Sequence, residues 1–217
     1  MRKRLGLVVA LCGLLTCVSC KKADPSVGSG VQKTETRDLP AFEKLRVGGS
    51  ASVEVTIGAP CPAEITTDDN LLGAVSTKLE GDVLHVTTAA ELRAKVPVRL
   101  RLCAPALRQV AAEGAARVQA GKISAERLTV QATGAAKVTL AGSSATLDAK
   151  LRTASSLDAA ELAIGSATVH ADQAASARLG HVEKLSVSIP AAGVVYYRGE
   201  PEITREVSKL ARVIQER

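Results

Sequence analysis

Two cysteines in the body of the chain, Cys61 and Cys103, are the side chains best placed for covalent chemistry. They are 42 residues apart, and each stands near a proline at the end of a predicted strand. In an exported protein two such thiols can pair. Closing a loop of that length would stabilise the fold by about 4 kcal/mol on the chain-entropy model. We expect a disulfide, with two separate buried thiols as the alternative.

The remaining reactive side chains do not form a pattern typical of catalysis or of a metal site. His85, His170 and His181 stand singly, without a second ligand at metal-binding spacing. Asp68 and Asp69 are adjacent, so in an extended chain their carboxylates point apart, and we expect a solvated corner rather than a glycosidase pair. Small-residue turns without a nucleophile elbow hold the candidate serines, which are Ser50, Ser155 and Ser176. We therefore predict no catalytic residues, no cofactor and no metal.

The amino terminus has the features of an export signal. A basic start, Arg2-Lys3-Arg4, precedes the apolar run from Leu5 to Leu15, which is too short to span a bilayer. Val18-Ser19-Cys20 resembles a bacterial lipobox, in which the signal is cut before a cysteine that receives a lipid. Cys17 is the rival lipidation site, and an ordinary secretory signal is the alternative. We expect a signal peptide over residues 1–19 and lipidation at Cys20.

Lipidation would anchor the protein to a membrane without a spanning helix. Residues 20–37 are rich in charge, Pro, Gly and Ser, which predicts a flexible tether. Lys21 after the acylated cysteine resembles the sorting pattern of outer-membrane lipoproteins. We expect an exported lipoprotein, held at the outer membrane on its periplasmic or surface side.

The charge of the exported chain excludes a strongly basic nucleic-acid binder. The whole sequence carries +6, and removal of residues 1–19 leaves 25 basic residues against 22 acidic ones, or +3. The three aromatic residues, Phe42, Tyr196 and Tyr197, offer no stacking platforms for bases. We expect no nucleic-acid partner.

Alternation of apolar and polar residues predicts strands in the first half of the chain. The pattern has period two, which places one face of each segment inside and the other outside. It covers residues 45–47, 51–57, 63–67, 84–87 and 96–102.

A small-residue motif then returns about every 20 residues. It is clearest at Gly114-Ala115-Ala116-Arg117-Val118 and Gly134-Ala135-Ala136-Lys137-Val138, with echoes beginning at residues 153, 175 and 191 and an earlier cousin at residue 49. Such spacing is typical of stacked coils that cannot bury their apolar faces alone. We predict an all-β parallel solenoid. The competing interpretation is an Ala-rich helix over residues 104–120, and residues 203–217 fit either a short helix or a final solenoid edge.

The chain resembles the GIN domain family, the head domain of auto-transporter adhesins, over about residues 42–216. The resemblance rests on Phe42-Glu43-Lys44-Leu45-Arg46-Val47, on the small-residue units, and on the closing segment Gly193-Val194-Val195-Tyr196-Tyr197-Arg198-Gly199-Glu200-Pro201. Thr153 and Ala175 stand where the family has Gly. The resemblance implies a right-handed β-solenoid over residues 38–217 in a bacterial envelope, with two subdomains, 38–105 and 106–217, as an alternative division.

Two classes of function remain on the sequence. The first is a lipid-anchored, non-catalytic binding or structural module whose partner is an envelope glycan or protein. The outward row that includes Arg99 and Arg101 would belong to such a surface, although a row of arginines is usually only a solvated face. The second is a carbohydrate-active enzyme, a polysaccharide lyase or hydrolase, built on the same fold. We expect the first.

Overall fold

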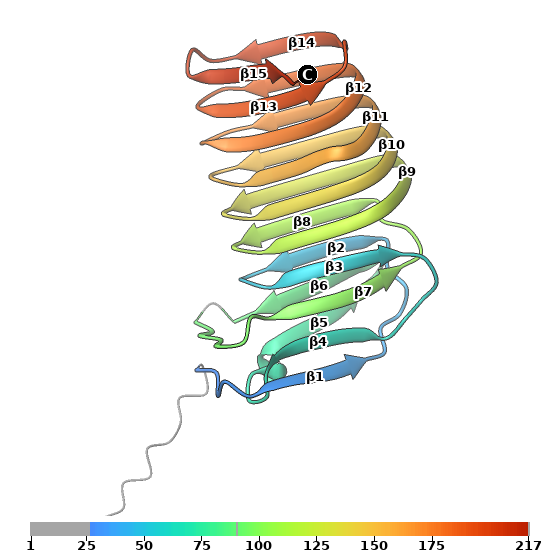
Figure 1. Cartoon of the computed structure of the whole chain (residues 1–217), viewed down its shortest axis with the longest axis vertical. Helices are drawn as coiled ribbons and strands as arrows, with labels where there is room; N and C mark the ends of the chain where they lie inside the picture. Colours follow the sequence, from blue (N-terminus) through green and yellow to red (C-terminus); the bar gives the residue numbers. More distant parts are fainter. Residues whose placement is uncertain (1–26, 90, 217) are drawn as a thin grey trace, which may run out of the picture.

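The chain folds into a stack of flattened β-coils, in which the strand at residues 52–57 lies between those at residues 99–104 and 117–121 and the later coils follow in chain order (Figure 1). The computed structural model describes residues 27–89 and 91–216. The stack has about five turns spaced about 20 residues apart, which confirms the predicted β-solenoid. The predicted export signal, residues 1–19, and both candidate lipidation sites lie outside the described residues.

The described strands form one continuous sheet, interrupted in sequence by a single 3-10 turn, η1, at Leu72–Ala74. The strands are β1 (Gln32–Arg37), β2 (Lys44–Gly48), β3 (Ser52–Ile57), β4 (Ala63–Asp68), β5 (Val75–Glu80), β6 (Val83–Thr88), β7 (Arg99–Ala104), β8 (Gln109–Gly114), β9 (Arg117–Gly134), β10 (Lys137–Arg152), β11 (Ser156–Ala171), β12 (Ala175–Ile189), β13 (Gly193–Arg198), β14 (Glu202–Val207) and β15 (Ala211–Gln215).

The long strands β9 to β12 each bend once, so that every coil contributes to two walls. The first wall runs in the order β7, β3, then the first halves of β9 to β12, then β13 and β15. The second wall contains β6, β2, β8, the second halves of β9 to β12, and β14. All of these pairings are parallel.

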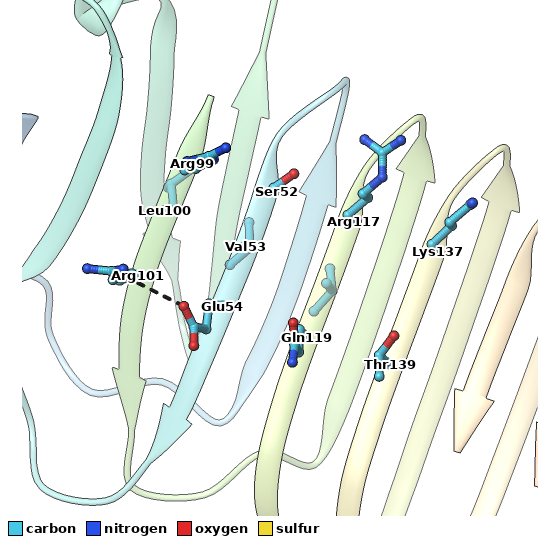
Figure 2. Close-up of a pocket in the computed structure, with 11 residues that line it drawn as sticks. Ser52, Val53, Glu54, Arg99, Leu100, Arg101, Arg117, Gln119, Lys137 and Thr139 are labelled. Atoms are coloured by element: carbon cyan, nitrogen blue, oxygen red, sulfur yellow. Dashed lines mark ion pairs between the residues drawn. The ribbon is translucent and has the colours of Figure 1, made fainter. Parts of the chain in front are cut away.

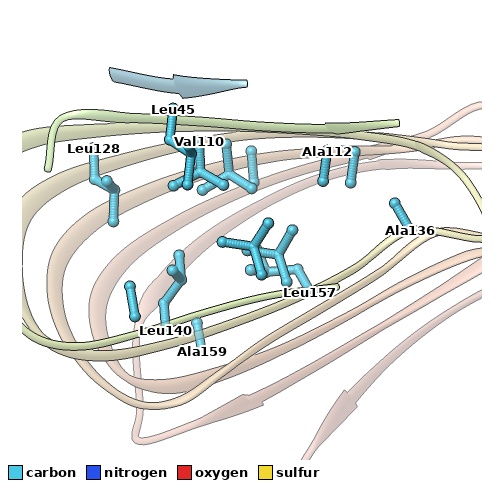
Figure 3. Packing of buried hydrophobic residues seen from close by; sticks show 14 of the residues in the cluster. Leu45, Val110, Ala112, Leu128, Ala136, Leu140, Leu157 and Ala159 are labelled. Carbon is cyan, nitrogen blue, oxygen red and sulfur yellow. The ribbon is translucent and has the colours of Figure 1, made fainter. Parts of the chain in front are cut away.

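The core lies between the two walls and consists mainly of small and aliphatic side chains, with Phe42 and Tyr197 as its aromatic members (Figure 3). One ladder shows the rule, since its members are in register on successive coils and all are buried: Leu100, Val53, Val118, Val138, Leu157, Ala177 and Val195. A narrow interior leaves room for alanine where a wider one would need rings, because interiors are close-packed. The Ala-rich segment 104–120 therefore forms strands, not a helix.

Antiparallel strands close the amino-terminal end of the stack. β4 pairs antiparallel with β7, β1 with β4, and β5 with β6. The alternative of two subdomains is not what the structure has, because β2 and β3 pair directly with β8 and β9 and one hydrophobic core runs through both parts.

The predicted tether is wrong over its second half, because residues 32–37 form strand β1. The strand is entirely polar, so hydrophobic periodicity could not reveal it. It is held instead by its backbone pairing with β4 and by the Arg37 side chain, whose Nη1 and Nη2 donate to the carbonyls of Val75 (2.7 Å) and Leu72 (3.0 Å).

One corner places a residue in the left-handed region on each of five successive coils, those of β3, β9, β10, β11 and β12. Gly49, Gly114 and Gly134 occupy it with φ of 88°, 76° and 84°, and a Cβ on Gly134 would lie 2.8 Å from the Gly114 carbonyl oxygen. Thr153 takes the same place on the next coil with φ of 62°.

On the following coil, the corner residue is not the one that the sequence repeat predicted. Leu157 is in register with Ala177, so the partner of Thr153 is Gln173 and not Ala175. Gln173 and Ala174 have φ of 56° and 67°, whereas Ala175 is an ordinary buried strand residue. In register, the coils step by 20, 19, 20, 18 and 18 residues from Arg117 to Arg212, which is more regular than the motif starts.

The carboxy-terminal segment is the final solenoid edge, made of β14 and β15, and not a helix. Arg205 is in register with the buried Val187 but is itself exposed, so it stands at an inward-facing position on the open end of the last coil. Its Nη2 donates to the hydroxyl oxygen of Tyr197 at 3.1 Å. A charged side chain at this inward position discourages another strand from continuing the core.

Candidate functional site

The structure places Cys61 beside Cys103 and joins them as a disulfide, with Cα atoms 5.4 Å apart. Cys61 lies in the connection between β3 and β4, and Cys103 lies in β7. The bond therefore ties the antiparallel end of the stack to its first wall.

The acidic corner at Asp68 is not solvated as the sequence predicted. Asp68 is fully buried, and the backbone N–H groups of Gly30, Lys95 and Val96 donate to its carboxylate at 2.6, 2.9 and 3.0 Å. Burial by itself raises the pKa of Asp68, but these hydrogen bonds stabilise the charged form and hold the pKa below its ordinary value of 3.8. A Cβ on Gly28 would lie 2.3 Å from this carboxylate. Asp68 therefore has a structural role, because it joins the backbone at Gly30 to the backbone at Lys95 and Val96. We call this hydrogen-bonded cluster the Asp68 clasp.

The neighbouring residues complete the clasp. Asp69 accepts a hydrogen bond from the Ser29 hydroxyl. The Asn70 side chain accepts one from the Ser29 N–H and donates one to the Val27 carbonyl, and both of these Asn70 bonds are 2.9 Å long. The acidic corner therefore fixes the segment that leads into β1.

The histidines do not converge. His170 is in register with Lys150 and Ser188, and His181 with Arg198. His85 does have a carboxylate nearby, since its Nε2 lies 3.6 Å from Glu80 Oε2 across the β5–β6 turn. Among the described residues, no group of three potential ligands is positioned to hold a metal ion.

The candidate serines have structural roles where the contacts define one. Ser155 is buried and its hydroxyl donates to the Ala132 carbonyl at 3.1 Å. The Ser50 backbone N–H donates to the hydroxyl of Thr88 at 3.2 Å. Ser176 lies in strand register between Ser156 and Val194.

A groove of about 360 Å³ lies on the outer side of the first wall, across β7, β3, β9 and β10 (Figure 2). Two rows of outward side chains border it. We define the first row as Arg99, Ser52, Arg117 and Lys137, and the second row as Arg101, Glu54, Gln119 and Thr139. Between them the groove is lined by Val53, Leu100 and Val118, whose side chains belong to the buried core ladder.

The strand pairing explains why these side chains are neighbours. Ser52 is in register with both Arg99 and Arg117, and Arg117 is in register with Lys137. Period-two alternation turns all of them outward, away from the core. Sequence distance is irrelevant here, since residues 52, 99, 117 and 137 meet only because coils stack.

In the second row, the positive charge of Arg101 is balanced by carboxylates on the neighbouring strands. Arg101 contacts both Glu54 and Glu64, with nitrogen to oxygen distances of 3.6 Å in each case. Glu54 and Glu64 lie on β3 and β4, on opposite sides of β7. A glycosidase holds two carboxyl groups on opposite sides of the scissile bond. However, the Arg101 guanidinium pairs with both carboxylates, so it occupies the place that a scissile bond would need.

Alternation in the sequence predicted two of the eight bordering residues, Arg99 and Arg101, to point outward. The alternation did not connect them with Arg117 and Lys137. The signal was present in the repeat, because both residues fill the fourth position of a small-residue unit, as does Ser52 in the unit that begins at Gly49. The fourth position of the unit is the first row of the groove.

None of the described helices has the length and apolar character needed to cross a membrane. A comparison with curated proteins found no match. Several crystal structures share the fold, including the following three. The first is a "putative adhesin" from Bacteroides fragilis, with 14% identity, a TM-score of 0.65, and coverage of 86% of this chain and 97% of that chain. The second is a "putative lipid binding protein" from Parabacteroides distasonis, with 15% identity, a TM-score of 0.58, and coverage of 88% and 98%.

The third is a "putative adhesin" from Parabacteroides merdae, with 18% identity, a TM-score of 0.52, and coverage of 88% and 98%. In sequence, residues 41–201 match the family described as "Putative auto-transporter adhesin, head GIN domain". This match takes in strands β2 to β13 and both rows of the groove. The chain therefore belongs to the GIN domain family.

Proposed function

We propose that this protein is an exported lipoprotein whose β-solenoid is a non-catalytic, adhesin-like binding module of the bacterial cell envelope. The observation that carries the proposal is the groove on the first wall, with its row of outward cations. Family membership supports it, because the family is described as an adhesin head. Two of the structural neighbours carry the same description.

The amino-terminal sequence supports the lipid anchor. Val18-Ser19-Cys20 would be cut before Cys20, and the acylated cysteine would be followed by Lys21 and Lys22. The clasp at Asp68 holds residues 27–31 against the antiparallel end of the stack. The anchor would thus attach at that end, and we infer an outer-membrane location from Lys21.

The balance of charges favours binding over catalysis. Among the described residues that line the groove, Glu54 alone carries a carboxylate, and it pairs with Arg101. A hydrolase of the usual kind needs two carboxyl groups free to act on opposite sides of one bond. We therefore propose recognition of a polymer without its cleavage.

The lipid anchor is tested by metabolic labelling with an alkyne fatty acid in a Gram-negative host. The full chain is expected to incorporate label and to fractionate with membranes. Cys20→Ala is expected to abolish both, and Cys17→Ala, as the matched control, to retain both. Labelling that survives in Cys20→Ala but not in Cys17→Ala would move the anchor to Cys17, and unlabelled full chain would refute the lipoprotein.

Binding and turnover are tested together with the mature chain and isolated envelope fractions. Retention of the protein on the fraction, with no soluble product released, is the expected result. Release of oligosaccharides would overturn the non-catalytic assignment in favour of the enzyme. No retention on any fraction would refute the binding module.

A further inference from the structure

The two rows that border the groove differ in how their charges are satisfied. In the second row Arg101 is held by Glu54 and Glu64. Further along the same row Arg178 pairs with Glu216, whose Oε1 accepts from Nη2 at 2.7 Å. In the first row, Arg99, Arg117 and Lys137 take part in none of the ion pairs formed between described residues. All three are exposed.

The register brings these first-row cations together. Arg117 and Lys137 are directly opposite each other on adjacent strands, about 4.8 Å apart along the stack. Like charges at this position repel and destabilise the sheet. An anion bound over them would relieve the repulsion, which gives the first row a reason to prefer a negatively charged ligand.

Ser52 makes room for such an anion. It lies between Arg99 and Arg117 in strand register, and its side chain is far shorter than either neighbour. The strands that carry the two arginines are therefore about 10 Å apart, which is two strand spacings, with only the short Ser52 side chain between them. Planar guanidinium groups bind carboxylate and sulfate in a bidentate manner, which favours these anions over a diffuse charge.

We propose that the first row binds an acidic polysaccharide, a linear glycan with carboxylate or sulfate groups, laid along the solenoid axis. This inference rests on the proposed binding function and names its ligand class. The acidic groups would lie over Arg99, Arg117 and Lys137. Beyond Lys137 the row continues in register with Ser156 and Ser176, whose hydroxyls suit the hydroxyls of a sugar.

The shape of the site favours a glycan chain over other polyanions. The groove is recessed between two rows of side chains, so it accepts a single chain, whereas an anionic bilayer needs a projecting basic surface. The residues that line it include no aromatic ring on which a base could stack. On the opposite border, Gln119 and Thr139 provide neutral hydrogen-bonding groups rather than more cations.

The experiment measures binding of the mature chain to polygalacturonate, to heparin and to neutral dextran at low and at 0.15 M salt. The test variant is Arg117→Glu with Lys137→Glu. The matched control is Arg127→Glu with Lys150→Glu, which changes the same residue types on the same strands β9 and β10 but on the second wall, where both side chains are also exposed. Melting temperatures check that both variants fold.

The wild type is expected to bind an acidic glycan, more weakly as salt rises, and to ignore dextran. The test variant should bind about tenfold more weakly or worse, the scale of hydrogen bonds to charged groups, while the control stays within about twofold. An equal loss in both variants would overturn the site, because net charge alone would then explain binding. Tighter binding to anionic vesicles or to DNA than to either glycan would overturn the ligand class.

The envelope retention assay separates the two levels of the proposal. Retention of the test variant on native envelope, together with failure of the wild type to bind acidic glycans, would refute the groove assignment and leave the binding module standing. Loss of envelope retention in the test variant but not in the control supports both.

Discussion

Replacing Thr153 by glycine is expected to stabilise the protein, although it removes a whole side chain. Thr153 is exposed and sits at a coil corner with φ of 62°, where Gly49, Gly114 and Gly134 stand on earlier coils. A non-glycine residue pays about 1–2 kcal/mol for the left-handed conformation. Glycine loses about 0.5–1 kcal/mol more backbone entropy on folding. The difference is a net gain of about 0.5–1 kcal/mol for Thr153→Gly.

Two further variants make the reasoning specific to the corner. Thr133→Gly removes the same side chain from an exposed position in β9, where φ is ordinary, and should destabilise by about 1 kcal/mol. Gly134→Ala should destabilise by about 2 kcal/mol or more, because it adds the left-handed cost to a Cβ placed 2.8 Å from the Gly114 oxygen.

The assay is urea unfolding of the mature chain, followed by circular dichroism. The midpoint should rise for Thr153→Gly and fall for the other two variants, with an unchanged denaturant slope. A lower midpoint for Thr153→Gly, of the size seen for Thr133→Gly, would show that the corner conformation carries no cost and would refute the argument.

Two further predictions concern the amino-terminal end. The depressed pKa of Asp68 means that its contribution to stability is complete above pH 3.8 and is lost as pH falls through the lower folded-state value. Acid unfolding curves of the wild type should therefore show a larger loss of stability than those of Asp68→Asn, which is less stable at neutral pH; parallel curves would contradict this. For Cys61 and Cys103, thiol titration of the denatured chain of residues 21–217, which contains no other cysteine, should find both reactive only after reduction. Reduction should lower the free energy of unfolding by about 4 kcal/mol for a 42-residue separation. Two thiols that titrate without reductant would exclude the bond.

The solenoid could be predicted from sequence because its causes are local and repeated. Period-two alternation recurs along the stack and small residues stand at several corners, so the motif at Gly114 and Gly134 was sufficient to infer the stack. The register could not be read where the corner residue changes type. Thr153 and Gln173 adopt the left-handed conformation although they are not glycine. The predicted repeat was therefore placed two residues too late, at Ala175 instead of Gln173.

Strand β1 and the groove could not be predicted from the sequence, for different reasons. β1 has no buried apolar face of its own, since backbone pairing, Arg37 and the Asp68 clasp hold it, and none of these has a periodic signature. The groove depends on cross-strand register between residues up to 85 positions apart, from Ser52 to Lys137. Outward positions were visible in the sequence, but their adjacency was a property of the fold.

Because the coils stack one on another, the number of coils sets the length of the molecule along the stack. The groove uses only the first four strands of the first wall, whereas that wall continues through β11, β12, β13 and β15. From β7 to β15 the eight strands span about 34 Å at ordinary strand spacing. Gaining or losing a coil beyond β10 would change that length by about 4.8 Å and leave the first-row contacts untouched. Reach and recognition can therefore vary separately in this architecture.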